Sequence, residues 1–133
     1  MEHSHFIVRA EVANCSFLRD LDYIENWMER LISDIEMEIL IYPQAAYCDE
    51  INNRGVTGIA ALKTSSMTFH AWDESDPAII QLDVYSCKKF DQNIVLSFLN
   101  EFKLQAYQTA LLDRKDVFTF IQNEGYGWDE FNE

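Results

Sequence analysis

The stretch from residue 55 to residue 87 reads GVTGIAALKTSSMTFHAWDESDPAIIQLDVYSC, and it decides the fold class. Within it, residues 67–72 and 78–87 each alternate between apolar side chains and polar or aromatic ones. Side chains of a strand point alternately to opposite faces, so each segment predicts a strand with one apolar face. Residues 57–63 predict a third strand. The turn residues between these strands favour β-hairpins over crossover connections.

Two segments on either side of this stretch predict helices. Their apolar side chains recur at steps of three and four, which gives a helix one buried stripe. Asp20 and Asp22 are candidate N-caps of the first helix, and Asp91 is a candidate N-cap of the second. The stripes consist of Leu21, Ile24, Met28, Leu31 and Ile35, and of Ile94, Val95, Phe98, Leu99 and Phe102.

Three further strands complete the prediction. Residues 5–12, 38–47 and 106–113 are apolar and rich in strand-forming residues, and Pro43 marks an edge, a bulge or a strand end. The order is then β-α-β-β-β-β-α-β. We expect an α+β fold with a single antiparallel-rich sheet, both helices covering one face, and one domain over residues 1–133.

The chain after residue 114 has no clear periodicity. It is nevertheless rich in aromatic side chains, which predicts that it docks on the rest of the protein. These residues are Phe118, Phe120, Tyr126, Trp128 and Phe131.

Composition excludes several classes of function. The formal net charge of −13 disfavours nucleic acid, and the densest basic stretch is only the pair Lys88-Lys89. No apolar run is long enough to cross a membrane. Three cysteines without a CxxC pair predict neither a zinc site nor a disulfide framework, so the cytoplasm is the expected compartment. His3 and His5 alone do not predict a metal site.

The polar sides of two of these strands carry the candidate chemistry. His70 and Trp72 share one side of residues 67–72, while Asp83, Tyr85 and Cys87 share one side of residues 78–87. If the helices cover the apolar side, His70 and Cys87 both belong to the uncovered face. Such a face, with aromatic and ionisable side chains, predicts a site, a subunit contact or both.

Four motifs within residues 55–87 resemble those of the S-adenosylmethionine decarboxylase family. Bacterial-type members of that family read roughly G-[VLA]-[ST]-G, E-S-H, H-T-W-P-E and V-D-V-[FY]-T-C. The resemblance extends from residue 5 to about residue 113, and the four motifs in order are more specific than any one alone. The matching segments here are GVTG, TSS, HAWDE and LDVYSC.

The resemblance implies a precursor that cuts itself. The break would fall between Thr64 and Ser65, and Ser65 would become a covalent pyruvoyl group, the only cofactor implied. His70 matches the histidine that assists cleavage, and Thr57 matches a hydrogen-bonding residue that supports it. Cys87 matches the group that returns a proton to the substrate after decarboxylation.

To return a proton, Cys87 must be a thiol, and we expect acidic neighbours such as Asp83 to disfavour its thiolate form.

The resemblance also assigns substrate contacts. Trp72 and Glu74 match residues that line the substrate site, and Ile51 falls on the position of an aromatic that stacks on adenine. An aliphatic side chain loses that stacking term, of about 1 kcal/mol. Tyr47 is an alternative aromatic for the role. Two further departures are Thr64, where the family usually has glutamate, and Ser66, where it usually has histidine.

The sequence therefore leaves three functions open. The first is a pyruvoyl-dependent decarboxylase of S-adenosylmethionine, which supplies the aminopropyl donor for spermidine and other polyamines. The second is a decarboxylase of another amino acid, such as ornithine or arginine. The third is an uncleaved homologue that binds S-adenosylmethionine or a partner. The resemblance also implies a homodimer in which two sheets face each other.

Overall fold

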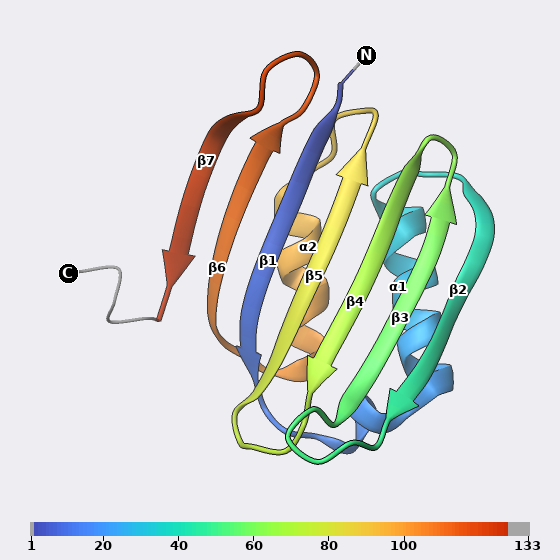
Figure 1. Ribbon diagram of the computed structural model, residues 1–133, viewed down its shortest axis with the longest axis vertical. Helices are drawn as coiled ribbons and strands as arrows, with labels where there is room; N and C mark the ends of the chain where they lie inside the picture. The colour runs from blue at the N-terminus through green and yellow to red at the C-terminus, as the bar shows by residue number, and fades with distance from the viewer. Residues whose placement is uncertain (1, 128–133) are drawn as a thin grey trace.

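One sheet of seven antiparallel strands forms a layer of the protein, and two helices form the other layer (Figure 1). The computed structural model describes residues 2–127. Across the sheet the strands follow the order β2-β3-β4-β5-β1-β6-β7. The predicted α+β fold class is confirmed. The elements are β1 (Ser4–Val12), α1 (Leu21–Asp34), β2 (Ile39–Cys48), β3 (Gly55–Leu62), β4 (Ser65–Trp72), β5 (Ala78–Ser86), α2 (Gln92–Leu99), β6 (Leu104–Asp113) and β7 (Thr119–Tyr126), with 3-10 turns at Ser16–Arg19 and Asn100–Phe102.

Each helix begins at an aspartate. Asp20 accepts a hydrogen bond from the backbone N–H of Tyr23 at 3.1 Å, and Asp91 accepts one from the N–H of Asn93 at 2.9 Å. Each carboxylate satisfies a donor that has no partner within its helix. Asp20, and not Asp22, is therefore the cap of α1. Within residues 2–127, no helix combines the length and the apolar character needed to cross a membrane.

The core lies between the helices and the sheet, and Trp27 of α1 is at its centre. Its ring packs against that of Phe69 on β4, with centroids 5.4 Å apart, and its Nε1–H donates to the carbonyl of Phe98 at 2.9 Å. A buried indole needs such a partner for its N–H. The predicted apolar sides of β4 and β5 face this core. They are formed by Met67, Phe69, Ala71, Ile80, Leu82 and Val84.

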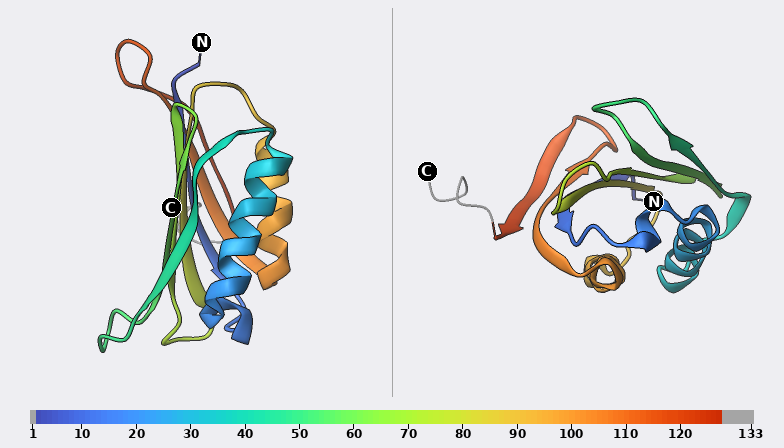
Figure 2. Two further views of the ribbon diagram at one scale, coloured as in Figure 1. Left: turned by 90° about the vertical axis from the view of Figure 1, so that its right-hand side faces the viewer. Right: turned by 90° about the horizontal axis from the view of Figure 1, so that it is seen from below.

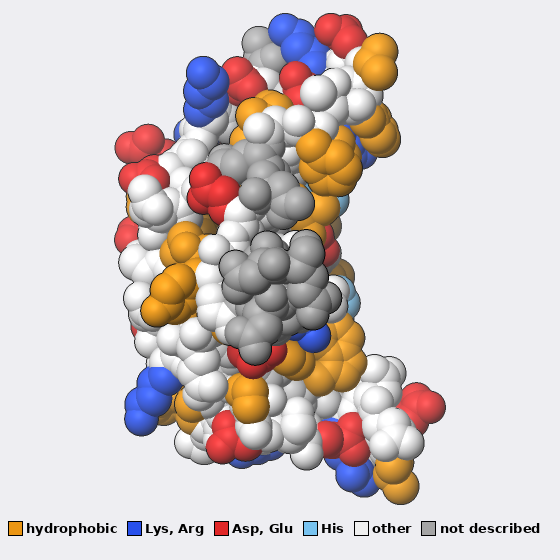
Figure 3. Space-filling model, turned by 90° about the vertical axis from the view of Figure 1, so that its left-hand side faces the viewer, with side chains coloured by type: hydrophobic (Ala, Val, Ile, Leu, Met, Phe, Trp, Pro, Cys, Tyr) orange, Lys and Arg blue, Asp and Glu red, His pale blue; other side chains and the backbone are white. Residues whose placement is uncertain are grey.

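The opposite face of the sheet is not covered by either helix (Figure 2). We call it the open face. The loop at residues 49–54 projects from one end of it, and the loop at residues 114–118 projects from the other end. Between them the profile of the molecule is hollowed (Figure 3). The predicted division into one covered and one uncovered face is confirmed.

Strand β7 was not predicted as a strand. It pairs with β6 along one edge of the sheet, and the register shifts between Leu111 and Leu112. The tail therefore docks through strand pairing as far as Tyr126, although the aromatic side chains on which the prediction rested, Phe118 before β7 and Phe120 and Tyr126 within it, stay exposed. Trp128 and Phe131 lie outside the described residues.

At the opposite edge, β2 contains Pro43. The β2–β3 register shifts between Ile39 and Ile41 and again between Ile41 and Gln44. A proline has no N–H to donate, so it is tolerated at an edge or a bulge, as the sequence predicts.

Candidate active site

The predicted site residues form two separate groups along β4. The first, which we call the serine–thiol cluster, consists of Thr64, Ser65 and Cys87. Lys63 and Thr64 form the two-residue turn between β3 and β4, Ser65 begins β4, and Cys87 follows β5. Since β4 and β5 are paired, the start of one lies beside the end of the other.

Hydrogen bonds connect the three residues of this cluster. The backbone N–H of Cys87 donates to Ser65 Oγ at 3.1 Å, and Ser65 Oγ lies 3.6 Å from Cys87 Sγ. Thr64 Oγ1 lies 2.9 Å from the same sulfur. The sequence predicts that Ser65 and Cys87 belong to one site, and the pairing of β4 with β5 brings them together.

The backbone at Thr64 is left-handed, with φ at 57°. In a two-residue turn this region suits glycine or asparagine, because a Cβ crowds the backbone there. The left-handed conformation costs an L-residue roughly 1–2 kcal/mol, and a β-branched residue such as threonine is rarely found in it. The strained residue directly precedes the peptide bond at which the resemblance places cleavage.

The pKa of the Cys87 thiol is lowered from its usual value, chiefly by hydrogen bonds from Thr64 and then from Ser65. The expectation that Asp83 would favour the thiol is wrong. Asp83 lies four positions back along β5, where it accepts a hydrogen bond from Thr68 Oγ1 at 3.0 Å and contacts His5 Nε2 at 3.2 Å. Four residues of a strand span about 13 Å, which is too far for a direct effect on the sulfur.

A cavity of about 400 Å³ opens beside the serine–thiol cluster. Residues 36–38, which connect α1 to β2, form its other wall together with residues 63 and 88. Lys88 Nζ donates to the carbonyl of Glu36, and Lys63 Nζ pairs with Glu38 at 3.4 Å. Ser65 and Cys87 are half-buried, so both can be reached from this cavity.

The second group, which we call the imidazole cluster, consists of Thr57, His70, Trp72 and Glu74. Thr57 and His70 are opposite each other on β3 and β4, and Thr57 Oγ1 lies 3.1 Å from His70 Nδ1. The ring of Trp72 is 6.1 Å from that of His70, and its Nε1–H donates to Asn53 at 2.9 Å. A cavity of about 180 Å³ lies against these side chains.

Glu74 holds the loop at residues 49–54. It accepts backbone hydrogen bonds from Asn52 at 3.0 Å and Arg54 at 3.2 Å, and these bonds, followed by the Arg54 charge, lower its pKa. Gly55 lets the loop approach β4, because a Cβ there would lie 1.7 Å from the carbonyl oxygen of Ala71. Ile51 is 68% exposed at the tip of this loop. Glu74 and Ile51 are thus at the same end of the sheet as His70.

Tyr47 cannot take the place of the missing aromatic on the open face. It pairs with Val56 of β3 and packs against the core, so its ring lies on the helix side of the sheet. Its hydroxyl donates to Asp73, at 3.1 and 3.0 Å from the two carboxylate oxygens. Burial, followed by this bond, raises the pKa of Tyr47.

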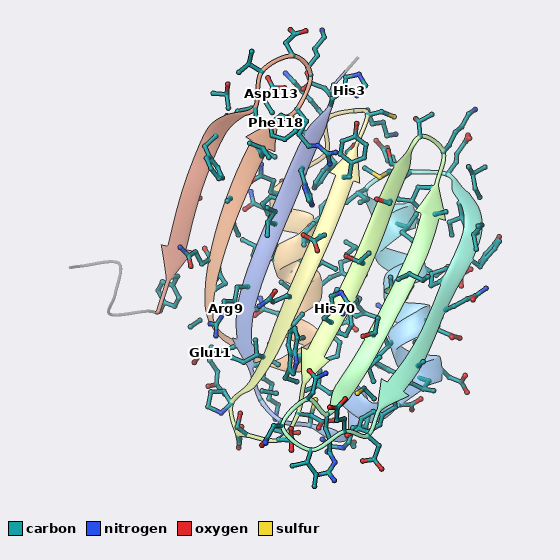
Figure 4. The ribbon with its side chains drawn as sticks, viewed as in Figure 1. His3, Arg9, Glu11, His70, Asp113 and Phe118 are labelled. Atoms are coloured by element: carbon teal, nitrogen blue, oxygen red, sulfur yellow. The ribbon has the colours of Figure 1, made fainter. Side chains whose placement is uncertain are left out.

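The two clusters lie at opposite ends of β4. Ser65 and His70 are five positions apart on a continuous strand, which corresponds to about 16 Å. Figure 4 labels His70 toward one end of the open face, and His3, Asp113 and Phe118 at the other end. His70 does belong to the open face, as predicted. Cys87 lies beyond the end of β5, so the two side chains do not meet within one chain.

The sequence did not indicate three contacts on the open face. His3 Nδ1 lies 3.0 Å from the hydroxyl of Tyr85, His5 contacts Asp83, and the Arg114 guanidinium lies 4.5 Å from the centre of the Tyr85 ring. The two histidine contacts depend on β1 lying beside β5, and the Arg114 contact depends on β6 lying beside β1, and no local pattern encodes either pairing. Among residues 2–127, no three His, Cys, Asp or Glu side chains are grouped as metal ligands would be.

Comparisons with known proteins agree on one family. Residues 4–115 match the family model described as S-adenosylmethionine decarboxylase. An S-adenosylmethionine decarboxylase proenzyme from Archaeoglobus fulgidus is 34% identical over 68 residues, which are 49% of this chain and 58% of that protein. The chain thus spans just over half of that relative's length.

The fold also matches a solved structure. The crystal structure of the adenosylmethionine decarboxylase from Aquifex aeolicus superposes with a TM-score of 0.70 at 14% identity, over 87% of this chain and 92% of that one. At this identity the likeness concerns the fold alone. The family model, however, extends from β1 through β6 and includes both clusters, and this chain therefore belongs to the S-adenosylmethionine decarboxylase family.

Proposed function

We propose that the protein is a self-cleaving, pyruvoyl-dependent decarboxylase of S-adenosylmethionine, and that its product serves as the aminopropyl donor in polyamine synthesis. The observation that carries the proposal is the serine–thiol cluster. Ser65 Oγ accepts a hydrogen bond from Cys87 N–H, directly after a residue with a left-handed backbone. Cys15, Cys48 and Cys87 are unpaired, which suits a reducing compartment such as the cytoplasm.

Cleavage would begin with Ser65 Oγ. The oxygen attacks the carbonyl carbon of Thr64, the C–N bond breaks, and an ester joins the two residues. A base then removes the Cα proton of residue 65, and the Cβ–Oγ bond breaks. That oxygen stays in a new carboxylate on Thr64, and residue 65 is left with a Cα=Cβ double bond that tautomerises to an imine. Water next replaces the nitrogen of residue 65, which departs as ammonia and leaves a ketone. The hydrogen bond from Cys87 N–H orients the attacking oxygen, and loss of the strained Thr64 backbone favours the forward direction.

The surroundings of Ser65 fit a pyruvoyl group. That group is no larger than the serine it replaces, so it needs no additional space. The N–H of Cys87 loses its acceptor when Ser65 Oγ leaves, so it would be available to an oxygen of the group or of the substrate, and the cavity of about 400 Å³ leaves room for a substrate. When present, the group supplies an electron sink for decarboxylation. Cys87 Sγ is near enough to return a proton to the substrate carbon.

We further propose that the active unit is a homodimer with composite sites. A general acid or base acts at hydrogen-bond distance, and His70 is about 16 Å from Ser65 along its own β4. In a two-fold symmetric dimer whose open faces meet, the strands of one chain are reversed end to end relative to those of the other chain. The imidazole cluster of one chain then lies opposite the serine–thiol cluster of its partner, and both sites form at once.

The open face has the side chains of such an interface. Trp72, Ile79 and Tyr85 are only half-buried in a single chain, and Ile59 is 53% exposed. Aromatic residues of this kind are enriched where protein surfaces meet. Sedimentation should therefore give a dimer at micromolar concentration, and a monomer there would contradict the composite site.

Intact mass after expression tests the cleavage. The proposal predicts two fragments, residues 1–64 and 65–133, the second lighter than simple hydrolysis would give because serine has become pyruvoyl. A Ser65→Ala chain is the matched uncut control. An uncut wild-type chain after prolonged incubation would contradict the proposal.

Release of carbon dioxide from carboxyl-labelled compounds tests which substrate the protein decarboxylates. S-adenosylmethionine should be decarboxylated, and ornithine and arginine should not. The reverse result would favour the decarboxylase of another amino acid, for which the exposed Ile51 is the motivating feature.

A further inference from the structure

The hydroxyl of Thr64 contacts both its own turn and the sulfur of Cys87. Thr64 Oγ1 lies 2.7 Å from the carbonyl of Lys63 and 2.9 Å from Cys87 Sγ. The resemblance implies a glutamate at position 64, so it does not assign this contact of the Thr64 hydroxyl. Neither the self-cleavage step nor the return of the proton, as derived above, uses this hydroxyl.

The hydroxyl has one hydrogen for two neighbours. When Cys87 is a thiol, its S–H faces the carbonyl of Lys63 at 3.8 Å, and the hydrogen of the Thr64 hydroxyl is shared between that carbonyl and the sulfur. When Cys87 is a thiolate, the hydroxyl turns and donates to the sulfur. Ser65 Oγ contributes a second, longer contact at 3.6 Å. Two hydroxyls therefore stabilise the charged form in the uncut chain.

Other charged groups around the sulfur remain in place throughout. Lys63 is in the turn and Lys88 follows Cys87, while Glu36 and Glu38 face the cluster from the α1–β2 connection. Lys63 Nζ pairs with the Glu38 carboxylate and Lys88 Nζ donates to the Glu36 carbonyl, so each lysine has a partner other than the Thr64 hydroxyl. Removing that hydroxyl therefore changes one contact of the sulfur and leaves the charges as they are.

We propose that Thr64 is a positioning residue that holds Cys87 Sγ in the uncut chain, and that cleavage of the 64–65 bond releases the sulfur. The release rests on the proposed function. Cleavage makes Thr64 a chain end and transfers the Ser65 oxygen into the Thr64 carboxylate, so both hydroxyl contacts are withdrawn in the same reaction. The thiol form, which can give a proton to the substrate carbon, is then favoured only after the cofactor has formed.

Alkylation of Cys87 by iodoacetamide across a pH range tests the positioning role. The parent is an uncut chain with Ser65→Ala, Cys15→Ala and Cys48→Ala, so that one thiol reacts and cleavage plays no part. Thr64→Val should shift the pH–rate midpoint upward and slow alkylation at pH 7 about threefold, because less thiolate is present. Thr64→Ser should restore the parent profile. Thr68→Val, on the same strand but bonded to Asp83, should leave it unchanged.

The release is tested in a chain that keeps Thr64 and Ser65 but has Cys87 as its one thiol. Alkylation at pH 7 should slow by about threefold or more after cleavage. Identical profiles for Thr64→Val and its parent would overturn the positioning role and leave the proposed function intact. Equal rates before and after cleavage would overturn the release. If the wild-type chain never cuts, both the release and the proposed function are wrong. The alkylation rates of the Ser65→Ala variants would still test the positioning role of Thr64.

Discussion

The two clusters at the ends of β4 differ in what they lack. The serine–thiol cluster has a nucleophile, a hydrogen-bond donor and a thiol, but the histidine that the motifs identify, His70, is about 16 Å away along β4. The imidazole cluster has a histidine held by Thr57 and a loop fixed by Glu74, but no nucleophile that the motifs identify. In the proposed dimer, the cluster of one chain would supply what the cluster of the other chain lacks. Variants at each end should therefore separate the work of one end from that of the other.

The largest effect is expected from Ser65→Ala. Without the hydroxyl no ester can form, so both self-cleavage and decarboxylation should be lost completely. Gel mobility and intact mass report the first, and carbon dioxide release reports the second. Ser66→Ala is the matched control, because it removes the neighbouring hydroxyl and should still cut. Cleavage of the Ser65→Ala chain at residues 64–65 would contradict the account.

Cys87→Ala should separate the two reactions. The donor to Ser65 Oγ is the backbone N–H of residue 87, which alanine retains, so self-cleavage should stay within about threefold of normal. Decarboxylation should fall about 100-fold, the usual loss when a general acid is removed. Cys15→Ala controls for loss of a thiol elsewhere. Equal losses in both reactions would mean that the sulfur also takes part in cleavage.

The sequence predicted the layers well because alternation is a local property. Residues 67–72 assign Met67 and Phe69 to the covered face and His70 to the open one, as the structure has them. Strand β7 was missed because its sequence has no alternation and its pairing with β6 is irregular. Tyr47 was misplaced because two register shifts in β2 decide which face it occupies, and such bulges leave no reliable local pattern.

The candidate site residues were chosen one by one from the motifs, and the sequence did not predict their distances from one another. Alternation assigns a side chain to a face of the sheet and gives no distance along it. Asp83 was therefore expected to neighbour Cys87, although it is four positions away along β5, and His70 was assigned to the same face as that thiol without a distance between them. The pairing of Thr57 with His70 could have been found by counting outward from the turn at residues 63 and 64, since a two-residue hairpin loop fixes the register.

A smaller effect is expected from Thr57→Val. Loss of one hydrogen bond to His70 should slow self-cleavage about fivefold, the equivalent of about 1 kcal/mol. Thr57→Ser should cut at the normal rate, because serine keeps the hydroxyl that bonds to His70 and lacks only the methyl group. A time course of the uncut band measures both. If both variants were equally slow, the methyl group would be what matters.

The smallest effect is expected from Glu74→Gln, and it depends on pH. The folded pKa of Glu74 is lowered, so its ionised form stabilises the fold above the unfolded pKa of about 4.3, and this contribution disappears as the pH falls through the folded value. The variant should thus melt below the wild type at pH 7, and the two melting temperatures should converge in acid. Glu50→Gln, in the same loop, is the control. A difference that persists at low pH would contradict the assignment.

The most direct test of the composite site is rescue between chains. A His70→Ala chain should fail to cut alone, because its partner also lacks the imidazole, and a Ser65→Ala chain cannot cut at all. In a mixed dimer the Ser65→Ala chain supplies His70 opposite the intact Ser65 of the other chain. Co-expression with distinguishable tags should therefore give fragments of the His70→Ala chain only. If that chain stays uncut although the mixed dimer forms, the imidazole does not act across the interface, and the central claim is wrong.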